Sequence, residues 1–542
     1  MDEGESRRHG TSERVPVVVA GAGPVGAVLA LELARHGVRS VVVDKTTGPS
    51  RHPKMDYLNG RSMEFLRRLG LATVIRERGV DPRHPFNFVW SRDFQEPPIA
   101  VWNYPSAAEL TRRIESVNDG SVPVEAHQRV QGSLLEDILR QRMRSVDLVD
   151  FREGWELVDL REGDDDVTVE LRATGGAGHR SVRAGYLAGC DGANSTVRQR
   201  LGVSVAQYGP TTLHRDVYFR STDPVLRRHG RAFLTIAAGG LTLVSRDEDA
   251  TWTGTVHLAD DRVRALDPVD HMRQCLGADF RVDEVLDVVE WEGRLAVSES
   301  YRSGRVFLAG DAAHQFYPTG GHGANTGIGD AVDLGWKLAA LVHGWGGPGL
   351  PASYERERRP VALFNREMCA NLLEVWLRFP RLVADGASRE HIAGFLEHET
   401  YQMDNLGIHF GYRYSSPLIR RDDEDTPPPW RWNAITASTW PGGRAPSVQL
   451  ADGTALFDLF DSGLTLVDFS ADGTGAELVK RAERRRIPVK HLAIDDDHVR
   501  RCWERDLVLV RPDQHVAWRG DRLPRDCDDL LDAVTGGGGA RA

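Results

Sequence analysis

The sequence predicts an α/β fold in three parts: a unit with a mainly parallel sheet, an antiparallel sheet inserted into it, and a smaller α/β unit at the C-terminal end. Glycine-rich turns near residues 21 and 320 each join a short apolar run to a helical pattern. Between them, residues 205–299 contain several β-rich, partly alternating runs. An acidic, proline-rich segment near residue 425 then precedes a β-α-β and a β-β-α pattern.

Composition limits the kinds of partner that this chain can have. At 542 residues it is long enough for two or three domains with full cores. Its 68 Lys and Arg against 79 Asp and Glu give a net charge of -11, which argues against nucleic acid or an anionic membrane as the main partner. The apolar stretch at residues 15–34 is interrupted by proline and glycine, so it does not read as a membrane segment. We therefore expect a cytoplasmic protein that binds a small molecule.

The cysteines and histidines give no sign of a metal site. The five cysteines show no CxxC pair or metal-ligand spacing, a pattern typical of reduced thiols. His314 and His322 lack a third ligand at a familiar spacing. We expect no bound metal.

The first glycine turn has the context of a dinucleotide-binding fingerprint. An apolar strand at Val17 to Ala20 leads into GAGPVG, Gly21 to Gly26, and a helix follows. A second strand, Ser40 to Val43, ends on Asp44. The glycines permit a tight turn and the close approach of a pyrophosphate, and the acid suits ribose hydroxyls.

Two further strands each end next to an acid. One leads to Asp191, with Ser195 placed to cap a short helix behind it. The other leads to Gly310-Asp311, and three glycines and a helical pattern follow. A carboxylate accepts hydrogen bonds from hydroxyl groups, whereas a helix start with nearby glycines suits an anion. The second stretch is therefore expected to hold a sugar alcohol and a delocalised anion.

Several polar side chains lie near these turns in the sequence. Lys54 and Arg61 are expected to face the ligand, whereas Arg67 and Arg68 read as a solvated helix face. Gln131 lies near the start of another helix, where its amide can reach a ligand.

The three acid-bearing stretches together resemble the class A FAD-dependent aromatic hydroxylases, which include para-hydroxybenzoate hydroxylase, phenol hydroxylase and the polyketide hydroxylases. These stretches are GAGPVG with Asp44, Asp191-Gly192 with Ser195 and Arg198, and Gly310-Asp311 with the glycine helix. The C-terminal unit is similar to the cysteine-free thioredoxin-like domain of the phenol hydroxylase branch. The resemblance implies a Rossmann-type FAD-binding domain with an inserted antiparallel β-sheet substrate domain and a C-terminal thioredoxin-like domain.

This organisation gives expected domain boundaries. They are a disordered tail at 1–14, the FAD-binding domain at 15–204 and 300–420, the substrate-binding sheet at 205–299, a linker at 421–446 and the thioredoxin-like domain at 447–542.

The resemblance also implies residue roles. The implied FAD contacts are Gly21, Gly23, Pro24 and Gly26 at the pyrophosphate, Asp44 near the adenosine ribose, Lys54 near the phosphates, Asp311 at the ribityl chain, and Pro318, Gly321, Gly323, Ala324 and Asn325 around the flavin ring. Lys45, Gln131 and Asp191 are further implied contacts of the cofactor. The motif of Asp191 is also tied to the nicotinamide cofactor. Asp56 matches an aspartate that contacts the substrate hydroxyl, and its alternative role is a helix N-cap or a solvated loop acid.

The implied activity is that of a monooxygenase. It would use FAD, NADPH or NADH, and O2 to hydroxylate a phenolic or polycyclic aromatic intermediate of antibiotic biosynthesis through a flavin C4a-hydroperoxide. Two alternatives stay open: Baeyer–Villiger or other oxidative ring chemistry on a polyketide or indolocarbazole, and a catalytically silent FAD-binding protein. The expected assembly is a monomer or homodimer.

Overall fold

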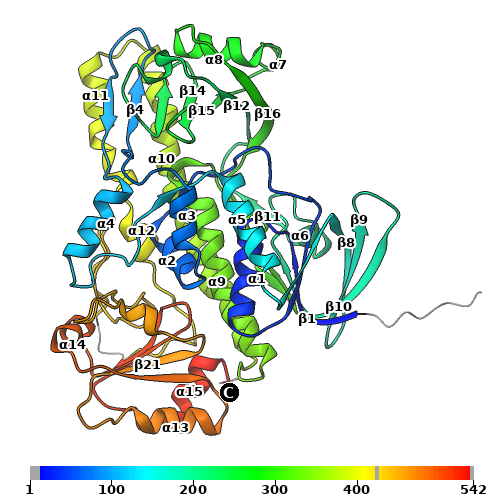
Figure 1. Ribbon diagram of the computed structural model, residues 1–542, viewed down its shortest axis with the longest axis vertical. Helices are drawn as coiled ribbons and strands as arrows, with labels where there is room; N and C mark the ends of the chain where they lie inside the picture. Colours follow the sequence, from blue (N-terminus) through cyan, green and yellow to red (C-terminus); the bar gives the residue numbers. More distant parts are fainter. Residues whose placement is uncertain (1–12, 422–425, 538–542) are drawn as a thin grey trace, which may run out of the picture.

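A computed structural model describes residues 13–421 and 426–537 of the chain (Figure 1). Most of the tail expected at 1–14 therefore lies outside the described residues, as do parts of the expected linker and of the C-terminal end. Glu13 and Arg14 are not part of a tail, because they begin the first strand and pair with Val182 and Arg183.

The central sheet has its strands in the order β18-β19-β10-β1-β2-β7 and is extended by β8 and β9. Pairing is parallel among β19, β10, β1, β2 and β7, so their carboxyl ends meet at one edge. The runs from Val17 to Ala20 and from Val41 to Val43 are almost fully buried. The strands are β1 (Glu13–Ala20), β2 (Ser40–Asp44), β7 (Val149–Glu153), β8 (Trp155–Glu162), β9 (Val167–Ala173), β10 (His179–Gly189), β18 (Arg302–Ser303) and β19 (Val306–Leu308).

Two helices follow the glycine turns and pack on this sheet. α1 (Pro24–Arg35) begins directly after the first turn, and α9 (His322–Val342) begins directly after the second. The two helices lie side by side in the centre of the molecule (Figure 1). Around them lie α2 (Gly60–Arg68), α3 (Ala72–Arg78), α4 (Ala107–Ser116), α5 (Gly132–Arg144), α6 (Thr196–Arg200) and the two-stranded β3 (Tyr57–Leu58) and β6 (Gln128–Arg129).

The inserted sheet is larger than residues 205–299. It runs β16-β12-β15-β14-β13-β4-β5, so two of its strands come from inside the first part of the chain. These two were missed because β4 is fully buried and β5 is short. The two ends of residues 205–299 contribute β11 and β17 to a separate small sheet, β11-β17-β20. The bounds are β4 (Phe88–Ser91), β5 (Ala100–Trp102), β11 (Val205–Gln207), β12 (Thr212–Arg220), β13 (Leu234–Ala237), β14 (Leu241–Ser245), β15 (Thr251–His257), β16 (Glu284–Gly293), β17 (Ala296–Ser298) and β20 (His314–Gln315).

Helices cover both sides of this sheet. α8 (Pro268–Leu276) packs on β12 and β14, and its Met272 side chain lies where a Cβ on Gly254 would be. α7 (Asp261–Arg264) lies beside β16, where Arg264 pairs with Glu290. On the other side, α10 (Leu350–Ala384) and α11 (Arg389–His398) pack against Trp90 and Trp102. α10 is a 35-residue helix that reaches from this lobe to the central unit (Figure 1). α12 (Leu406–Phe410) then begins the return toward the C-terminal unit.

The C-terminal unit has a four-stranded sheet in the order β22-β21-β23-β24. β21 and β22 are parallel and are joined by a helix, and β23 and β24 form an antiparallel hairpin, as the sequence pattern predicts. The elements are β21 (Leu464–Asp468), α13 (Ala476–Arg484), β22 (Val489–Ala493), α14 (Asp497–Trp503), β23 (Leu507–Val510), β24 (Val516–Gly520) and α15 (Cys527–Thr535). The segment expected as a linker is partly buried, since Trp440, Arg444 and Ala445 are less than a tenth exposed.

The hairpin turn at 511–515 inserts charged side chains between this unit and the central helices. Arg511 is fully buried and donates to Glu357 of α10 and to Asp333 of α9. Lys337 of α9 donates to the same two carboxylates at 2.6 and 2.7 Å. These ion pairs connect the C-terminal unit directly to α9, the helix that follows the second glycine turn.

Candidate active site

The first glycine turn contains glycines of two kinds. A Cβ on Gly21 would overlap the carbonyl oxygen of Cys190, and one on Gly26 would overlap that of Gly21. These two positions need glycine because of the protein's own backbone. At Gly23 a Cβ would meet nothing within 4 Å. Gly23 and Pro24 at the start of α1 thus leave a space that a ligand can fill.

The acid after β2 lies beside this turn. Asp44 accepts the backbone N–H of Ala22 at 2.7 Å and that of Thr46 at 2.8 Å. Its carboxylate therefore orders the glycine loop, and it remains half-buried at the sheet edge, beside the exposed Lys45. The carboxylate also accepts the Thr46 hydroxyl at 2.6 Å. Of the about four acceptor positions on two carboxylate oxygens, roughly one therefore remains for a ligand hydroxyl.

The acid after β10 forms hydrogen bonds to residues that are close to it in the sequence. Asp191 accepts the hydroxyl of Ser195 at 2.5 Å and the backbone N–H of Val197 at 3.0 Å. Ser195 in turn caps α6 by accepting the N–H of Arg198, as expected. Both carboxylate oxygens of Asp191 are thus engaged at the start of this helix.

The acid after β19 is held differently. Gly310 has a φ of 62°, and its N–H donates to Asp330 of α9 at 3.1 Å. Asp330 also contacts His314 Nε2 at 2.8 Å and Arg358 Nε at 2.8 Å. The turn is therefore fastened on both sides of Asp311, whose own side chain stays exposed.

The second glycine turn continues from the exposed Pro318 into α9. Gly320 and Gly321 have φ values of 77° and 66°, which side chains rarely adopt. A Cβ on Gly323, which precedes the half-buried Ala324, would meet nothing within 4 Å. The start of α9 thus presents backbone N–H groups that have no acceptor within the helix, next to an open position.

Asn325 ties this turn to β3, the short strand that begins directly after Asp56. Its Oδ1 accepts the N–H of Asn59 at 3.0 Å, and its Nδ2 donates to the carbonyls of Tyr57 and Gly321 at 3.0 and 2.7 Å. The Tyr57 ring lies against Gly321, where a Cβ would be only 2.8 Å away. Residues 56–59 and the glycine turn therefore form one structural unit.

Asp56 is buried, with 6% of the residue exposed. Its Oδ2 lies 3.4 Å from Arg129 Nε, and its Oδ1 lies 3.8 Å from Arg246 Nη1. Burial raises the pKa of Asp56 to about 6, although the two arginines oppose the shift. Oδ1 has no hydrogen-bond partner in the described part of the chain. Asp56 is thus neither a helix N-cap, a role that Asn59 takes at α2, nor a solvated acid.

The two arginines were not found from the sequence. Arg129 pairs with Asp56 and Glu248 and donates to the carbonyl of Ser245. Arg246 donates to Thr253 at 2.9 Å. They lie on β6 and just after β14, far from Asp56 in sequence, and single arginines near strands carry no signal of a shared site.

Lys54, Arg61 and Gln131, the two cations and the amide that were expected to face the ligand, lie in three different places. Lys54 is exposed, and Gln131 accepts the hydroxyl of Tyr218 at 3.2 Å. The expectation for Arg61 is wrong, because it is buried against Glu64 and the C-terminal turn. Arg68 is also not solvated, because it pairs with the buried Glu32. Both errors arise because the C-terminal unit covers α2.

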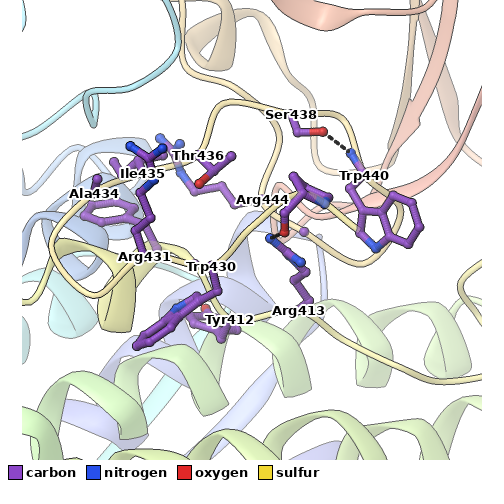
Figure 2. A pocket seen from close by; sticks show the side chains of 14 residues that line it. Tyr412, Arg413, Trp430, Arg431, Ala434, Ile435, Thr436, Ser438, Trp440 and Arg444 are labelled. Carbon is purple, nitrogen blue, oxygen red and sulfur yellow. Dashed lines mark hydrogen bonds between the residues drawn. The ribbon is translucent and has the colours of Figure 1, made fainter. Parts of the chain in front are cut away.

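A separate cavity lies where α12 and the expected linker meet (Figure 2). Its walls include Trp430, Arg413 and Arg444, and its volume is about 30 Å³. That is room for one or two water molecules and not for an aromatic ring. A second, open depression of about 360 Å³ lies on the surface near Arg172 and Arg200. Neither is lined by the acids described above.

Comparisons with known proteins cover almost the whole chain. The family described as "FAD binding domain" matches residues 14–365, and "Aromatic-ring hydroxylase, C-terminal" matches residues 438–537. The chain is 34% identical to the FAD-dependent monooxygenase apdD of Emericella nidulans, over 96% of this chain and 90% of apdD. It is 30% identical to aklavinone 12-hydroxylase RdmE of Streptomyces purpurascens, over 96% of this chain and 98% of RdmE.

Solved structures give the same result for the fold. RebC with bound 7-carboxy-K252c superimposes with a TM-score of 0.86 at 32% identity, over 97% of this chain and 99% of RebC. Aklavinone-11 hydroxylase in a ternary complex with FAD and aklavinone superimposes with a TM-score of 0.79 at 27% identity, over 97% of this chain and 100% of the other. Within the described residues, every helix is too short or too polar to cross a membrane.

Proposed function

This chain belongs to the FAD-dependent aromatic hydroxylases, and we propose that it hydroxylates a phenolic or polycyclic aromatic intermediate of natural-product biosynthesis. In the proposed reaction, NAD(P)H supplies two electrons and O2 supplies both oxygen atoms. One oxygen enters a ring C–H bond as a hydroxyl, and the other leaves as water, whose two hydrogens correspond to the hydride of NAD(P)H and one proton taken from solvent. Relatives named for aklavinone and tetracenomycin B2 support a polycyclic substrate.

The residues at the sheet edge fit FAD. Gly23 and Gly323 lie in different turns, and each has open space where a side chain would be. Asp44, Asp191 and Asp311 follow parallel strands that end at the same edge. Bound FAD supplies two-electron redox chemistry and the activation of O2. The proposed contacts are Gly21, Gly23, Pro24, Gly26, Asp44, Lys45, Lys54, Gln131, Asp191, Asp311, Pro318, Gly321, Gly323, Ala324 and Asn325.

Asp56 is the proposed base, and its environment carries the proposal. A phenol reacts with an electrophilic oxygen fastest when its hydroxyl proton is shared with or taken by a base. A carboxyl with a pKa of about 6 is ionised at neutral pH and still binds a proton more readily than an ordinary aspartate. Arg129 and Arg246 hold this carboxylate from two sides, and Oδ1 is left to accept the phenol proton.

Turnover of a panel of phenols and polycyclic aromatics by the FAD-loaded enzyme tests the proposal. We expect aromatic-stimulated NAD(P)H oxidation with O2 uptake and a product heavier by one oxygen atom. Asp56→Ala should lower hydroxylation by at least about 100-fold while FAD stays bound, because general bases contribute factors of this size. The exposed Asp164→Asn should behave like the wild type.

Two results would contradict parts of this assignment. If Asp56→Ala forms product at the normal rate, the base is another group. If no aromatic stimulates NAD(P)H oxidation, the chain is a silent FAD-binding protein. Comparison of NADPH with NADH in the same assay identifies the preferred reductant.

A further inference from the structure

We propose that Glu248 is a positioning residue of the active site, which draws Arg129 away from Asp56 so that Asp56 keeps its ability to accept a proton. This inference deepens the proposed function and rests on it, because it takes Asp56 as the base. It comes from the turn between β14 and β15, whose central residue, Glu248, is buried, charged and held in an unusual backbone conformation.

One of three successive acids in this turn lies inside the protein. Turns are usually exposed, yet Glu248 is only 2% exposed. Asp249 is exposed, and Asp247 is half-buried. The Asp247 Oδ1 accepts the backbone N–H groups of residues 249, 250 and 251. Asp247 therefore organises the turn, and the buried carboxylate of Glu248 is not needed for that purpose.

The backbone of Glu248 has a φ of 59°, which lies in the left-handed region. Glycine, asparagine and aspartate adopt this region more readily than glutamate does. Conformations of this kind are strained, and they are found most often at functional sites, where surrounding contacts hold them. The glutamate here has an aspartate on either side, so its conformation points to a role for the longer side chain.

The Glu248 carboxylate lies between two arginines. Its Oε1 accepts a hydrogen bond from Arg129 Nη1, and its Oε2 lies 3.5 Å from Nη1 of Arg227. Arg227 ends the short 3-10 helix η1 (Pro224–Arg227) and also donates to the carbonyl of Asp249. A lone buried carboxylate is costly, so these two cations compensate the charge of Glu248.

Arg129 gives its closest contacts to groups other than Asp56. Its Nη1 donates to Glu248, and its Nη2 donates to the carbonyl of Ser245. Nε is left for Asp56 at 3.4 Å, whereas a charge-assisted hydrogen bond usually spans about 2.7–2.9 Å. A guanidinium can bind one carboxylate through two parallel hydrogen bonds. The contact with Glu248 prevents that arrangement at Asp56.

The second arginine beside Asp56 also has another partner. Arg246 Nε donates to the Thr253 hydroxyl at 2.9 Å, and its Nη1 lies 3.8 Å from Asp56. Burial lowers the pKa of Arg246, although the nearby Asp56, Asp216 and Tyr218 oppose the shift. Asp56 is thus held loosely by both of its cations.

The spacing of these charges explains why Asp56 stays basic. A close arginine lowers the pKa of an aspartate by about 1–3 units, whereas a second carboxylate nearby raises it. Burial raises the pKa of Asp56 to about 6, the two arginines oppose the shift, and Glu248 adds to it. Glu248 therefore has two effects of the same sign. Its charge repels the ionised Asp56, and its pairing with Arg129 keeps that cation at a distance.

Infrared spectroscopy of the FAD-loaded enzyme tests this inference without turnover. The C=O stretch of protonated carboxyl groups is followed from about pH 8 to about pH 4, the range in which a raised carboxyl titrates. The band that is lost in Asp56→Asn belongs to Asp56. We expect its midpoint near pH 6 in the wild type. In Glu248→Gln it should be lower by at least about one pH unit, because Asp56 then replaces Glu248 as the partner of Arg129.

Matched variants separate the charge of Glu248 from its structural effect. Glu248→Asp keeps the charge and suits the left-handed backbone, so its midpoint should stay close to that of the wild type. Glu248→Gly removes the charge without backbone strain and should give the same low midpoint as Glu248→Gln. Asp249→Asn removes a charge at the exposed neighbouring position and should leave the midpoint unchanged. FAD absorbance reports whether each variant is folded and loaded.

The pH profile of turnover gives a second readout. In Glu248→Gln the low-pH limb of kcat/KM should move to lower pH by the same amount as the infrared midpoint. The rate at neutral pH should fall about 3-fold, because a weaker base accepts the phenol proton less readily. A residue that only held the fold together would lower the rate without moving the limb.

The inference is overturned if the infrared midpoint of Asp56 is the same in Glu248→Gln and Glu248→Gly as in the wild type. It is also overturned if Glu248→Asp lowers the midpoint as much as those two variants do. A lower midpoint combined with a wild-type kcat/KM profile that does not follow Asp56 supports the role of Glu248. That combination removes Asp56 as the base of the proposed function, so the two failures are distinguishable.

Discussion

Arg511 and Glu357 form a two-contact ion pair in the interior of the protein, with Arg511 nitrogens 2.7 and 2.9 Å from the carboxylate oxygens. Both side chains are fully buried, and they join the last hairpin to α10. Asp333, Lys337 and Asp513 complete the group. Buried charges are tolerated because each has an opposite partner, so removing one leaves the rest uncompensated.

Replacing Arg511 should therefore destabilise the whole chain. Arg511→Met is expected to lower the free energy of unfolding by about 3–5 kcal/mol, measured by urea denaturation of the FAD-free protein. Arg481 pairs with Glu477 and Asp528 at the surface of the same unit, so Arg481→Met should destabilise the chain much less than Arg511→Met. Equal losses in the two variants would show that the buried pair has no special role.

Asp330 should affect FAD affinity more than its neighbour Asp333 does. Asp330→Asn weakens the contacts that fasten Gly310 and His314, which flank Asp311. We expect FAD to bind about 10–100-fold more weakly, as for the loss of a charge-assisted hydrogen bond. Titration of the FAD-free protein with FAD measures this. Asp333→Asn is the matched control, since it destabilises the same helix without touching the turn.

The two kinds of glycine should respond differently to alanine. Gly23→Ala and Gly323→Ala place a methyl group in open space, so the FAD-free protein should keep its thermal midpoint while FAD affinity falls. Gly26→Ala should instead lower the midpoint, because its Cβ would overlap the carbonyl oxygen of Gly21. If FAD affinity is unchanged in both Gly23→Ala and Gly323→Ala, these two glycines are not part of the proposed FAD site.

The pH dependence of turnover should report Asp56. The base must be ionised to accept a proton, and burial raises its pKa to about 6. kcat/KM is therefore expected to fall as the pH drops below about 6, with a tenfold loss for each further pH unit. The profile is measured with a substrate that does not titrate in this range. A flat profile down to pH 5 would exclude Asp56 as the essential base.

Much of the fold follows from local sequence patterns. The glycine turns, the acids after buried strands and the helices behind them depend on residues that are close in sequence, so Asp44, Asp191 and Asp311 were placed at strand ends correctly. The resemblance to a known family added the order of the domains. The comparisons confirm the family and the α/β fold class.

Contacts between distant segments could not be predicted. β4 pairs with β13 across 146 residues of chain, from Phe88 to Leu234, and nothing in the sequence of Phe88–Ser91 specifies that partner. Arg61 was expected to face the cofactor. Its partners at 513–514 are far away in sequence, so its burial against them could not be predicted. The neighbours of Asp56 could not be predicted for the same reason, since Arg129 and Arg246 approach it only in the folded chain.

The buried Arg511 also sets an order of events during synthesis. Its partners Asp333 and Glu357 precede it by 178 and 154 residues, so they leave the ribosome long before it does. Contacts of such long range form late and slow folding. The helix behind the second glycine turn therefore waits, with Lys337 as the one cation of the group for two acids, until almost the entire chain has been translated. Nascent chains are exposed to misfolding throughout that interval.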